Sequence, residues 1–183
     1  MPHLYVEDPR HRIQPVHLSD AEYARAISAL IIVCTDVLII DAARQTIALA
    51  QRAVLPMRGL WCIGGRRRAG ERSEASIRRC FQRETGLDLP EDRFRFLCAV
   101  EYLWANRAQE PSDAGSHNLS YQFTVELDAS ERALAAAHLD PREYDVAHGL
   151  RDFARADLVT ASVHPVILDW YDAVFSTRHR DGT

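Results

Sequence analysis

The chain has 183 residues, of which 47% are hydrophobic, so it is long enough to bury one substantial core and short for two. Its 22 Lys and Arg residues against 26 Asp and Glu residues give a formal net charge of -4, which argues against nucleic acid or an anionic membrane as a partner. The first residues carry charges and prolines, and no run approaches the roughly eighteen apolar residues of a membrane span, so we expect a soluble, cytoplasmic protein.

The cysteines are spread along the chain without a CxxC pair, at Cys34, Cys62, Cys80 and Cys98. Three of them lie inside apolar runs. This distribution favours reduced thiols in a core over a disulfide framework or a zinc site.

The first segment with a local structural signal begins at Ser19. Residues 1–18 are polar and aperiodic, so we predict an N-terminal extension there and one domain over residues 19–183. Ser19 and Glu22 have the spacing of a capping box, in which two side chains satisfy backbone N–H groups at a helix start. A short helix to about Ala29 follows from this pattern.

Two strands come next, and each carries a charged residue of interest. The run Leu30–Ile40 is rich in β-branched and aliphatic residues, which is typical of a buried strand, yet Asp36 lies in its middle. After a turn at residues 41–45, Thr46–Gln51 alternates as a returning strand that ends beside Arg52. Because burial of an unpaired charge is costly, the position of Asp36 inside a buried strand needs a structural or functional explanation.

A basic, glycine-containing loop over residues 66–71 leads to a predicted helix over Ser73–Thr85, which Gly86 ends. Four of its residues share one face because they are spaced by three and four positions: Ile77, Cys80, Phe81 and Glu84. A glutamate therefore lies on the apolar stripe of this helix.

The rest of the chain alternates between strand, loop and helix signals. The predicted elements are a strand over Phe94–Tyr102, a polar loop over Ala105–Ser116, a strand over Leu119–Leu127, a helix over Ser130–His138, a loop over Asp140–Arg151 and a closing helix over Pro165–Phe175.

The segment from Gly65 to Leu87 resembles the Nudix box, whose pattern is G-x5-E-x7-R-E-U-x-E-E-x-G-U with U apolar. The residues that stand at matching positions are Gly65, Glu71, Arg79, Phe81, Glu84, Gly86 and Leu87. So many matches over a loop and a helix are far more specific than a lone glycine motif. Two helix glutamates of the pattern are replaced, the first by Cys80 and the second by Arg83.

The resemblance implies an α/β (α+β) Nudix fold, with a mixed β-sheet between helices, and a hydrolase that uses Mg²⁺. Because one helix carboxylate remains, we expect one Mg²⁺ ion, held by Glu84 and the carbonyl of Gly64, with the other ligands from water and substrate. As in other Nudix boxes, Glu71 and Arg79 are expected to brace the loop against the helix.

One branch of that family, the GDP-mannose mannosyl hydrolases, has the same reduced box and resembles this chain over roughly residues 19–175. The shared features are an aspartate inside the first strand, Asp36, an arginine at a strand end, Arg52, and a tryptophan before the Gly-Gly pair, Trp61. The resemblance implies that Arg52 contacts the leaving diphosphate and that Asp36 helps to hold a nucleoside diphosphate sugar. That branch forms dimers, so a homodimer is expected.

The mechanism that the branch implies is displacement at the anomeric carbon. Water, deprotonated by a histidine, attacks C1 while Mg²⁺ on Glu84 and the guanidinium of Arg52 stabilise the departing diphosphate. His148 is the best positional match for the base, and its competitors are His117, His138 and His164. Ala147 stands where the branch has a glutamine metal ligand, and Glu143 or Asp145 offers a replacement oxygen.

Three functions stay open at this stage. The first is Mg²⁺-dependent hydrolysis of a nucleoside diphosphate sugar to free sugar and nucleoside diphosphate. The second is a conventional Nudix pyrophosphatase, and the third a module that binds a nucleotide sugar without cleaving it, since Cys80 and Ala147 both weaken the metal site.

Each candidate residue also has an ordinary structural interpretation. Glu84 can form a salt bridge to Arg83 or Arg79, Asp36 can cap a turn, and Arg52 can be a solvated strand end. The run Arg66–Arg68 is either a solvated loop or a phosphate contact, with Arg66 as the candidate substrate-binding residue.

Overall fold

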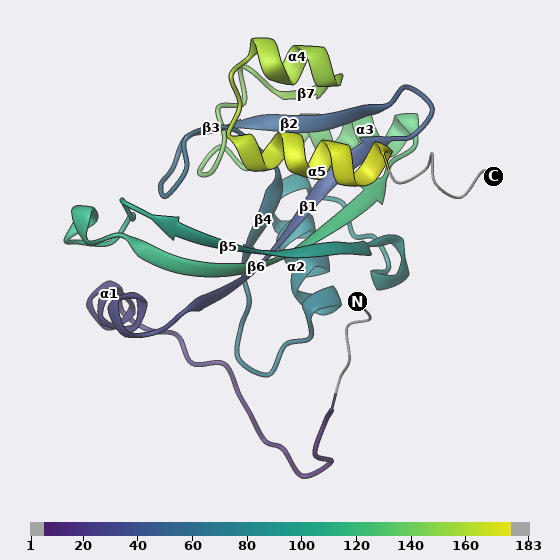
Figure 1. The fold of residues 1–183 in the computed structure, drawn as a ribbon. Helices are drawn as coiled ribbons and strands as arrows, with labels where there is room; N and C mark the ends of the chain where they lie inside the picture. The colour runs from purple at the N-terminus through teal and green to yellow at the C-terminus, as the bar shows by residue number, and fades with distance from the viewer. Residues whose placement is uncertain (1–5, 177–183) are drawn as a thin grey trace.

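The computed structural model describes residues 6–176, which form one mixed sheet with helices on both faces (Figure 1). Its helices and strands are, in chain order, α1 (Asp20–Ala29), β1 (Ile32–Asp41), β2 (Thr46–Arg52), β3 (Gly59–Trp61), β4 (Ile63–Arg66), α2 (Ser73–Thr85), the 3-10 helix η1 (Glu91–Arg93), β5 (Arg95–Trp104), the 3-10 helix η2 (Ser112–Ala114), β6 (Ser116–Glu126), α3 (Ala129–Ala137), β7 (Leu150–Phe153), α4 (Arg155–Thr160) and α5 (Pro165–Phe175). The fold class is therefore the one that the sequence predicts. No helix within residues 6–176 is long and apolar enough to cross a membrane.

The sheet is organised around β1, which has two partners on one edge and one on the other. β1 runs parallel to β6 along its whole length, whereas β4 pairs antiparallel with its first half and β2 with its end. The remaining strands extend these pairs in the order β3-β2-β1-β6-β5, and β7 adds to β2. After Val37 the antiparallel partner of β1 changes from β4 to β2. The sheet therefore splits into two branches at this point, close to Asp36.

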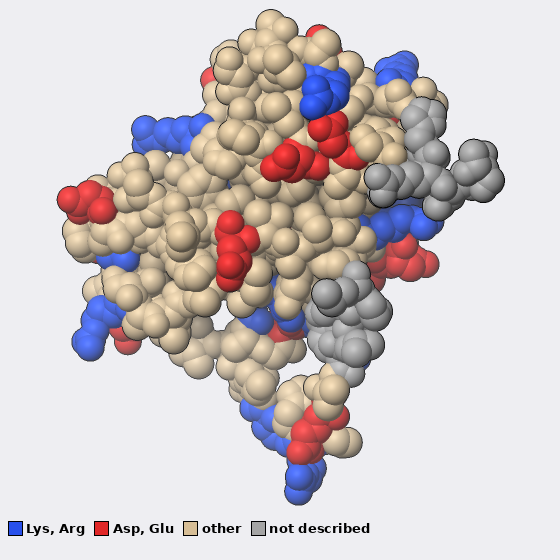
Figure 2. Space-filling model, viewed as in Figure 1, with Lys and Arg blue, Asp and Glu red and all other residues tan. Residues whose placement is uncertain are grey.

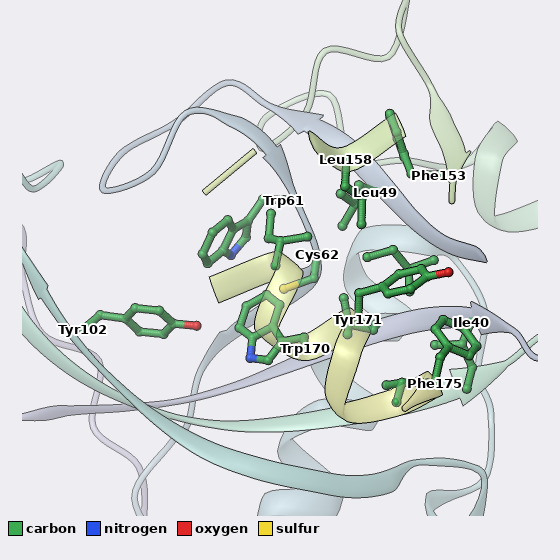
Figure 3. Close-up of a cluster of buried hydrophobic side chains, with 14 residues drawn as sticks. Ile40, Leu49, Trp61, Cys62, Tyr102, Phe153, Leu158, Trp170, Tyr171 and Phe175 are labelled. Atoms are coloured by element: carbon green, nitrogen blue, oxygen red, sulfur yellow. The ribbon is translucent and has the colours of Figure 1, made fainter. Parts of the chain in front are cut away.

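Each face of the sheet carries its own hydrophobic core, because successive side chains of a strand point to opposite faces. Leu38 and Ile40 of β1 pack on one face against α5, whose Trp170 is almost fully buried (Figure 3). Val37 and Ile39 pack on the other face against α2. The apolar run Val37–Ile40 of β1 is therefore typical of a strand that is covered on both faces.

The helix ends follow the local signals in the sequence. Ser19 and Glu22 form the predicted capping box at the start of α1, with the Ser19 N–H donating to Glu22 Oε2 at 2.8 Å. α2 spans the predicted residues and ends at Gly86, whose φ of 72° is a left-handed conformation that favours glycine. α5 also begins and ends where it is predicted.

Short elements were not predicted. β3, β4, β7 and α4 have three to six residues each, and β7 lies partly inside a segment predicted as a loop. Two of the four β7 side chains are exposed, so its sequence has little hydrophobic pattern, and its pairing with β2 is a tertiary effect. Within the predicted N-terminal extension, residues 6–18 contain no helix or strand.

The ring of Phe81 allows a direct test of the core between α2 and the sheet. Phe81 is fully buried and packs edge to face against Phe94, with 5.5 Å between ring centroids. We expect Phe81→Ala to lower the free energy of unfolding by about 3–5 kcal/mol in urea denaturation, because it leaves a cavity. Leu134→Ala, at a side chain that is 49% exposed, is the control and should change it by less than about 1 kcal/mol. Equal effects would mean that Phe81 does not support the core.

Candidate functional site

A pocket of about 470 Å³ lies over β1, β4, β5 and β6, beside the point where the sheet divides. It is rich in arginine and in aromatic rings: its lining includes Arg52, Arg66, Arg68, Arg79, Arg83, Arg107, Tyr23, Trp61, Tyr102 and Trp104. A second pocket, of about 570 Å³, is lined by residues of η1, β5 and α5 and contains none of the sequence-predicted site residues. The first pocket is therefore the candidate site.

The charge of this pocket contrasts with the face of the molecule drawn in Figure 2. On that face, the described acidic and basic side chains lie in small groups of both signs. A concentration of arginine inside a cleft, on a chain with a net charge of -4, points to an anionic ligand bound locally.

Asp36 lines the pocket and is 8% exposed. Its Oδ2 accepts a hydrogen bond from the Ser120 hydroxyl at 2.5 Å. Burial raises the pKa of Asp36 to about 6, although Ser120 and Arg52 both act to lower it. The charge inside the predicted strand is therefore held at the pocket and not in a turn.

Gly64 lies opposite Asp36 in the pairing of β4 with β1. A Cβ atom at this position would lie 2.1 Å from Asp36 Oδ1 and 2.5 Å from the Thr35 carbonyl oxygen. Only glycine permits this approach, because one of the two clashing atoms belongs to the backbone.

Arg52, at the end of β2, also lines the pocket. Its Nη2 lies 3.4 Å from Glu143 Oε2, and its Nε is buried without a hydrogen-bond partner among the described residues. Backbone bonds position Glu143: the Ala53 N–H donates to the Glu143 carbonyl at 2.8 Å, and the Asp145 N–H donates to Gln51 at 2.8 Å. The loop after α3 thus brings a carboxylate into the pocket.

Glu71 and Arg79 form the brace that the box resemblance implies. Arg79 Nε and Nη2 contact the two carboxylate oxygens of Glu71 at 2.6 and 2.8 Å, and Nη2 also donates to the Arg66 carbonyl at 3.0 Å. A bidentate pair of this kind fixes both partners in one geometry. The ion pair ties the basic loop to α2.

Glu84 is 1% exposed and is surrounded by hydrogen-bond donors. Its Oε2 accepts from the Tyr144 hydroxyl at 2.5 Å and from the Gly64 N–H at 3.4 Å, and its Oε1 forms an ion pair with Arg83. Burial raises the pKa of Glu84, and the bonds from Tyr144 and Arg83 act against that rise. The salt bridge to Arg83 is the ordinary interpretation that the sequence left open for this residue.

These side chains do not fit the magnesium site predicted on Glu84 and Gly64. Both Glu84 oxygens already have donors, and Arg83 places a positive charge beside them where the box pattern has a glutamate. Within residues 6–176, no group of three or more His, Cys, Asp or Glu side chains is placed to hold a metal ion.

The structure does not bring the predicted base to the pocket. The His148 side chain is 55% exposed, and its Nδ1 lies 2.8 Å from Asp145 Oδ2. Neither His148 nor its competitors His117, His138 and His164 belong to the described lining of the pocket. A catalytic role for His148 stays a prediction.

Tyr102 and Trp104 are pocket residues that the sequence did not single out. Their rings stack, with 5.0 Å between centroids and 17° between planes, and the Tyr102 hydroxyl is buried without a partner among the described residues. Their two-residue spacing within β5 places them on one face of the sheet, which is the signal that could have found them. Tyr144, in a predicted loop, gave no such signal.

Solved structures that resemble this fold include Nudix hydrolases. The MutT Nudix hydrolase from Burkholderia pseudomallei matches with a TM-score of 0.55 and 23% identity, over 70% of this chain and 87% of that chain. A Nudix hydrolase from Nitrosomonas europaea matches with a TM-score of 0.53 and 14% identity, over 81% and 90%. The chain has the Nudix fold.

A third match is the Caenorhabditis elegans Ap4A hydrolase, with a TM-score of 0.51 and 8% identity, over 81% of this chain and 98% of that chain. No model of a protein family matches the sequence, and no curated protein matches it either. Identities this low establish the Nudix fold and no activity, because one fold can host many reactions.

The raised pKa of Asp36 gives a test through the pH dependence of stability. Its folded-state pKa of about 6 lies above its ordinary value of 3.8, so the folded protein binds this proton more tightly than the unfolded chain does. The contribution of Asp36 to the free energy of unfolding therefore falls as the pH rises between these values, by roughly 3 kcal/mol at most. We expect Asp36→Asn to remove this part of the slope in urea unfolding at a series of pH values.

Asp41→Asn, at the last residue of β1, is the matched control and should keep the slope of the wild type. If Asp36→Asn and the wild type had parallel pH profiles, the folded environment would not hinder ionisation of Asp36, and its assignment as a buried pocket carboxylate would be wrong.

Proposed function

We propose that the protein binds a nucleoside diphosphate derivative, such as a nucleotide sugar, in the arginine-lined pocket and hydrolyses it. The observation that carries the proposal is the set of arginines that line one 470 Å³ pocket together with Asp36 and aromatic rings. The Nudix fold is compatible with it, since a neighbour of this fold, the Ap4A hydrolase, is named for a nucleotide substrate.

Several pocket arginines keep donors for a diphosphate. Glu71 engages two guanidinium nitrogens of Arg79, but Arg52 has an unpaired Nε, and the Arg68 side chain has no salt bridge among the described residues. Arg66 lies over the Tyr23 ring, 3.8 Å from its centroid, an arrangement that leaves its N–H edge for other contacts. Guanidinium groups match phosphate oxygens in bidentate geometry, so these residues form the phosphate subsite.

The polar end of the pocket suits hydroxyl groups. Burial and, second, the charge of Asp36 raise the pKa of Tyr102, so this group stays a hydroxyl and lies within electrostatic reach of Asp36. A carboxylate that accepts and a hydroxyl that donates are the groups that recognise sugar hydroxyls. Asp36 and Tyr102 therefore form the proposed sugar subsite.

The reaction we propose is cleavage of the glycosyl C–O bond. A water attacks C1 and loses its proton to a base, while the C–O electron pair leaves with the diphosphate, whose charge Arg52 stabilises. Glu143 is the pocket carboxylate on the loop that also carries His148, and its Oε2 lies 3.4 Å from Arg52 Nη2. We assign the base role to Glu143, since His148 is not among the residues that line the pocket.

Isotope labelling tests the reaction. The protein is incubated with GDP-mannose and a panel of other nucleotide sugars, with Mg²⁺, in ¹⁸O-labelled water, and the label is located by mass spectrometry. We expect the label in the free sugar. Label in a phosphate would instead establish a conventional pyrophosphatase, and binding without turnover would establish a binding module; either result contradicts the proposed reaction.

Arg52→Gln tests the phosphate subsite in the same assay. We expect it to lower kcat/KM by at least about tenfold, because it removes a charged donor from the leaving diphosphate. Arg78→Gln is the matched control, because Arg78 is paired with Asp88 at 2.7 Å and does not line the pocket. If the two variants had equal kcat/KM, Arg52 would not belong to the phosphate subsite.

Tyr102→Phe tests the sugar subsite with opposite effects on stability and binding. The hydroxyl is buried and unpartnered, so its removal should raise the free energy of unfolding of the ligand-free protein by about 1 kcal/mol. Nucleotide-sugar affinity, measured by calorimetry, should fall about fivefold because the hydroxyl donates to the ligand.

Tyr171→Phe is the control for this pair of effects. The Tyr171 hydroxyl donates to the Gln45 carbonyl at 2.7 Å, so this variant should lose stability and keep its affinity. A Tyr102→Phe protein with unchanged affinity would place the sugar elsewhere.

A further inference from the structure

Arg83 occupies a distinctive place in the pocket. It stands at a helix position where the box pattern has a glutamate, and it forms an ion pair with the neighbouring Glu84. A Cβ atom on Gly65 would lie 3.1 Å from Arg83 Nη2 and 3.2 Å from Cys80 Sγ. The guanidinium therefore lies between the glycines of β4 and the face of α2.

The predicted cation ligand Glu84 lies at this same position, and the backbone of Gly64 contacts it. Glu84 contacts the guanidinium directly, and the Gly64 N–H contacts the other carboxylate oxygen of Glu84 at 3.4 Å. Cys80, at the first of the two replaced glutamate positions, also lies beside Gly65. The positive charge of Arg83 is thus located where glutamates of the box would gather around a metal ion.

We infer that the guanidinium of Arg83 takes the place of a divalent cation in this protein: it neutralises the buried Glu84 and supplies positive charge to the diphosphate, so that ligand binding needs no metal. The identity of the ligand rests on the proposed function. The claim about the cation position rests on the contacts of Glu84 alone.

A divalent cation would compete poorly for this position. To reach Glu84 it must displace both Arg83 and the Tyr144 hydroxyl, and the displaced guanidinium would remain nearby as a like charge. Cys80 is a poor replacement ligand for Mg²⁺, because this cation prefers oxygen ligands and the Cys80 side chain ends in sulfur. A guanidinium, in contrast, keeps its charge at every physiological pH.

Arg83 also faces the ligand side of the site. Its side chain is 42% exposed and lines the pocket together with Arg52, whereas Glu84 behind it is almost fully buried. One guanidinium can donate to a buried carboxylate and to a phosphate oxygen at once, because it has five N–H groups in a planar fork.

Manganese titration, followed by the electron paramagnetic resonance of free Mn²⁺, tests the cation position without any assay of activity. We expect the wild type to bind no Mn²⁺ in a saturable way up to millimolar concentration. Arg83→Glu, which restores the box carboxylate, should bind about one Mn²⁺ per chain. Arg78→Glu changes the charge equally at a surface position of the same helix and should behave as the wild type does.

Saturable Mn²⁺ binding by the wild type that is lost in Glu84→Gln would overturn the inference. This arm uses a protein with its native fold, so it decides the question even if Arg83→Glu does not fold. Thermal unfolding with and without Mn²⁺ gives a second readout, because a cation that binds the folded state raises its melting temperature.

Calorimetry with inorganic pyrophosphate tests the ligand side. The wild type should bind it equally in EDTA and in Mg²⁺, and Arg83→Gln should bind it about tenfold more weakly. If wild-type binding required Mg²⁺, the inference would fail while the proposed function stood. If neither pyrophosphate nor nucleotide sugars bound at all, the proposed function would fail, and the manganese titration would still decide what occupies the cation position.

Discussion

The burial of Glu84 is the constraint on which the rest of the site depends. A carboxylate that is 1% exposed requires donors, and the donors come from separate parts of the chain: Tyr144 from the loop after α3, Gly64 from β4 and Arg83 from α2. The backbone carbonyl of Glu84 also accepts from the Asp140 N–H at 3.0 Å. One side chain and its backbone therefore fix the loop that carries the pocket carboxylate next to the end of β2.

The positive charge of the pocket comes from arginine side chains. All 22 basic residues of the chain are arginines, so each positive side chain presents a planar group of directed donors that stays charged. In the pocket, Glu71 holds one arginine rigid, whereas Arg52 keeps a free donor. Replacing helix glutamates by Cys80 and Arg83 removes acidic ligands and adds a cation, and the site becomes complementary to an anion by itself.

The sequence predicted what depends on local signals. The capping box at Ser19 and the span of α2 follow from neighbouring residues, and the position of Asp36 in a buried strand marked it as a candidate, which the structure places in the pocket lining. The contacts of Tyr144 and Arg83 could not be predicted, because each joins residues whose approach depends on the complete fold. A sequence motif places a residue on a given helix or loop, whereas the orientation and the contacts of its side chain depend on tertiary packing.

The close approach of Gly64 to β1 separates two kinds of position in the segment from β4 to α2, most of which resembles the Nudix box. At Gly64 the obstacle to a larger side chain includes backbone atoms of the neighbouring strand, so the restriction holds whatever reaction the protein performs. Glu71 and Arg79 likewise maintain the shape of the loop. Arg83, in contrast, lines the pocket with a side chain that is 42% exposed, so mutation can change it while the scaffold persists. A lineage can therefore alter its chemistry at the helix face and still inherit the turn and strand that present it.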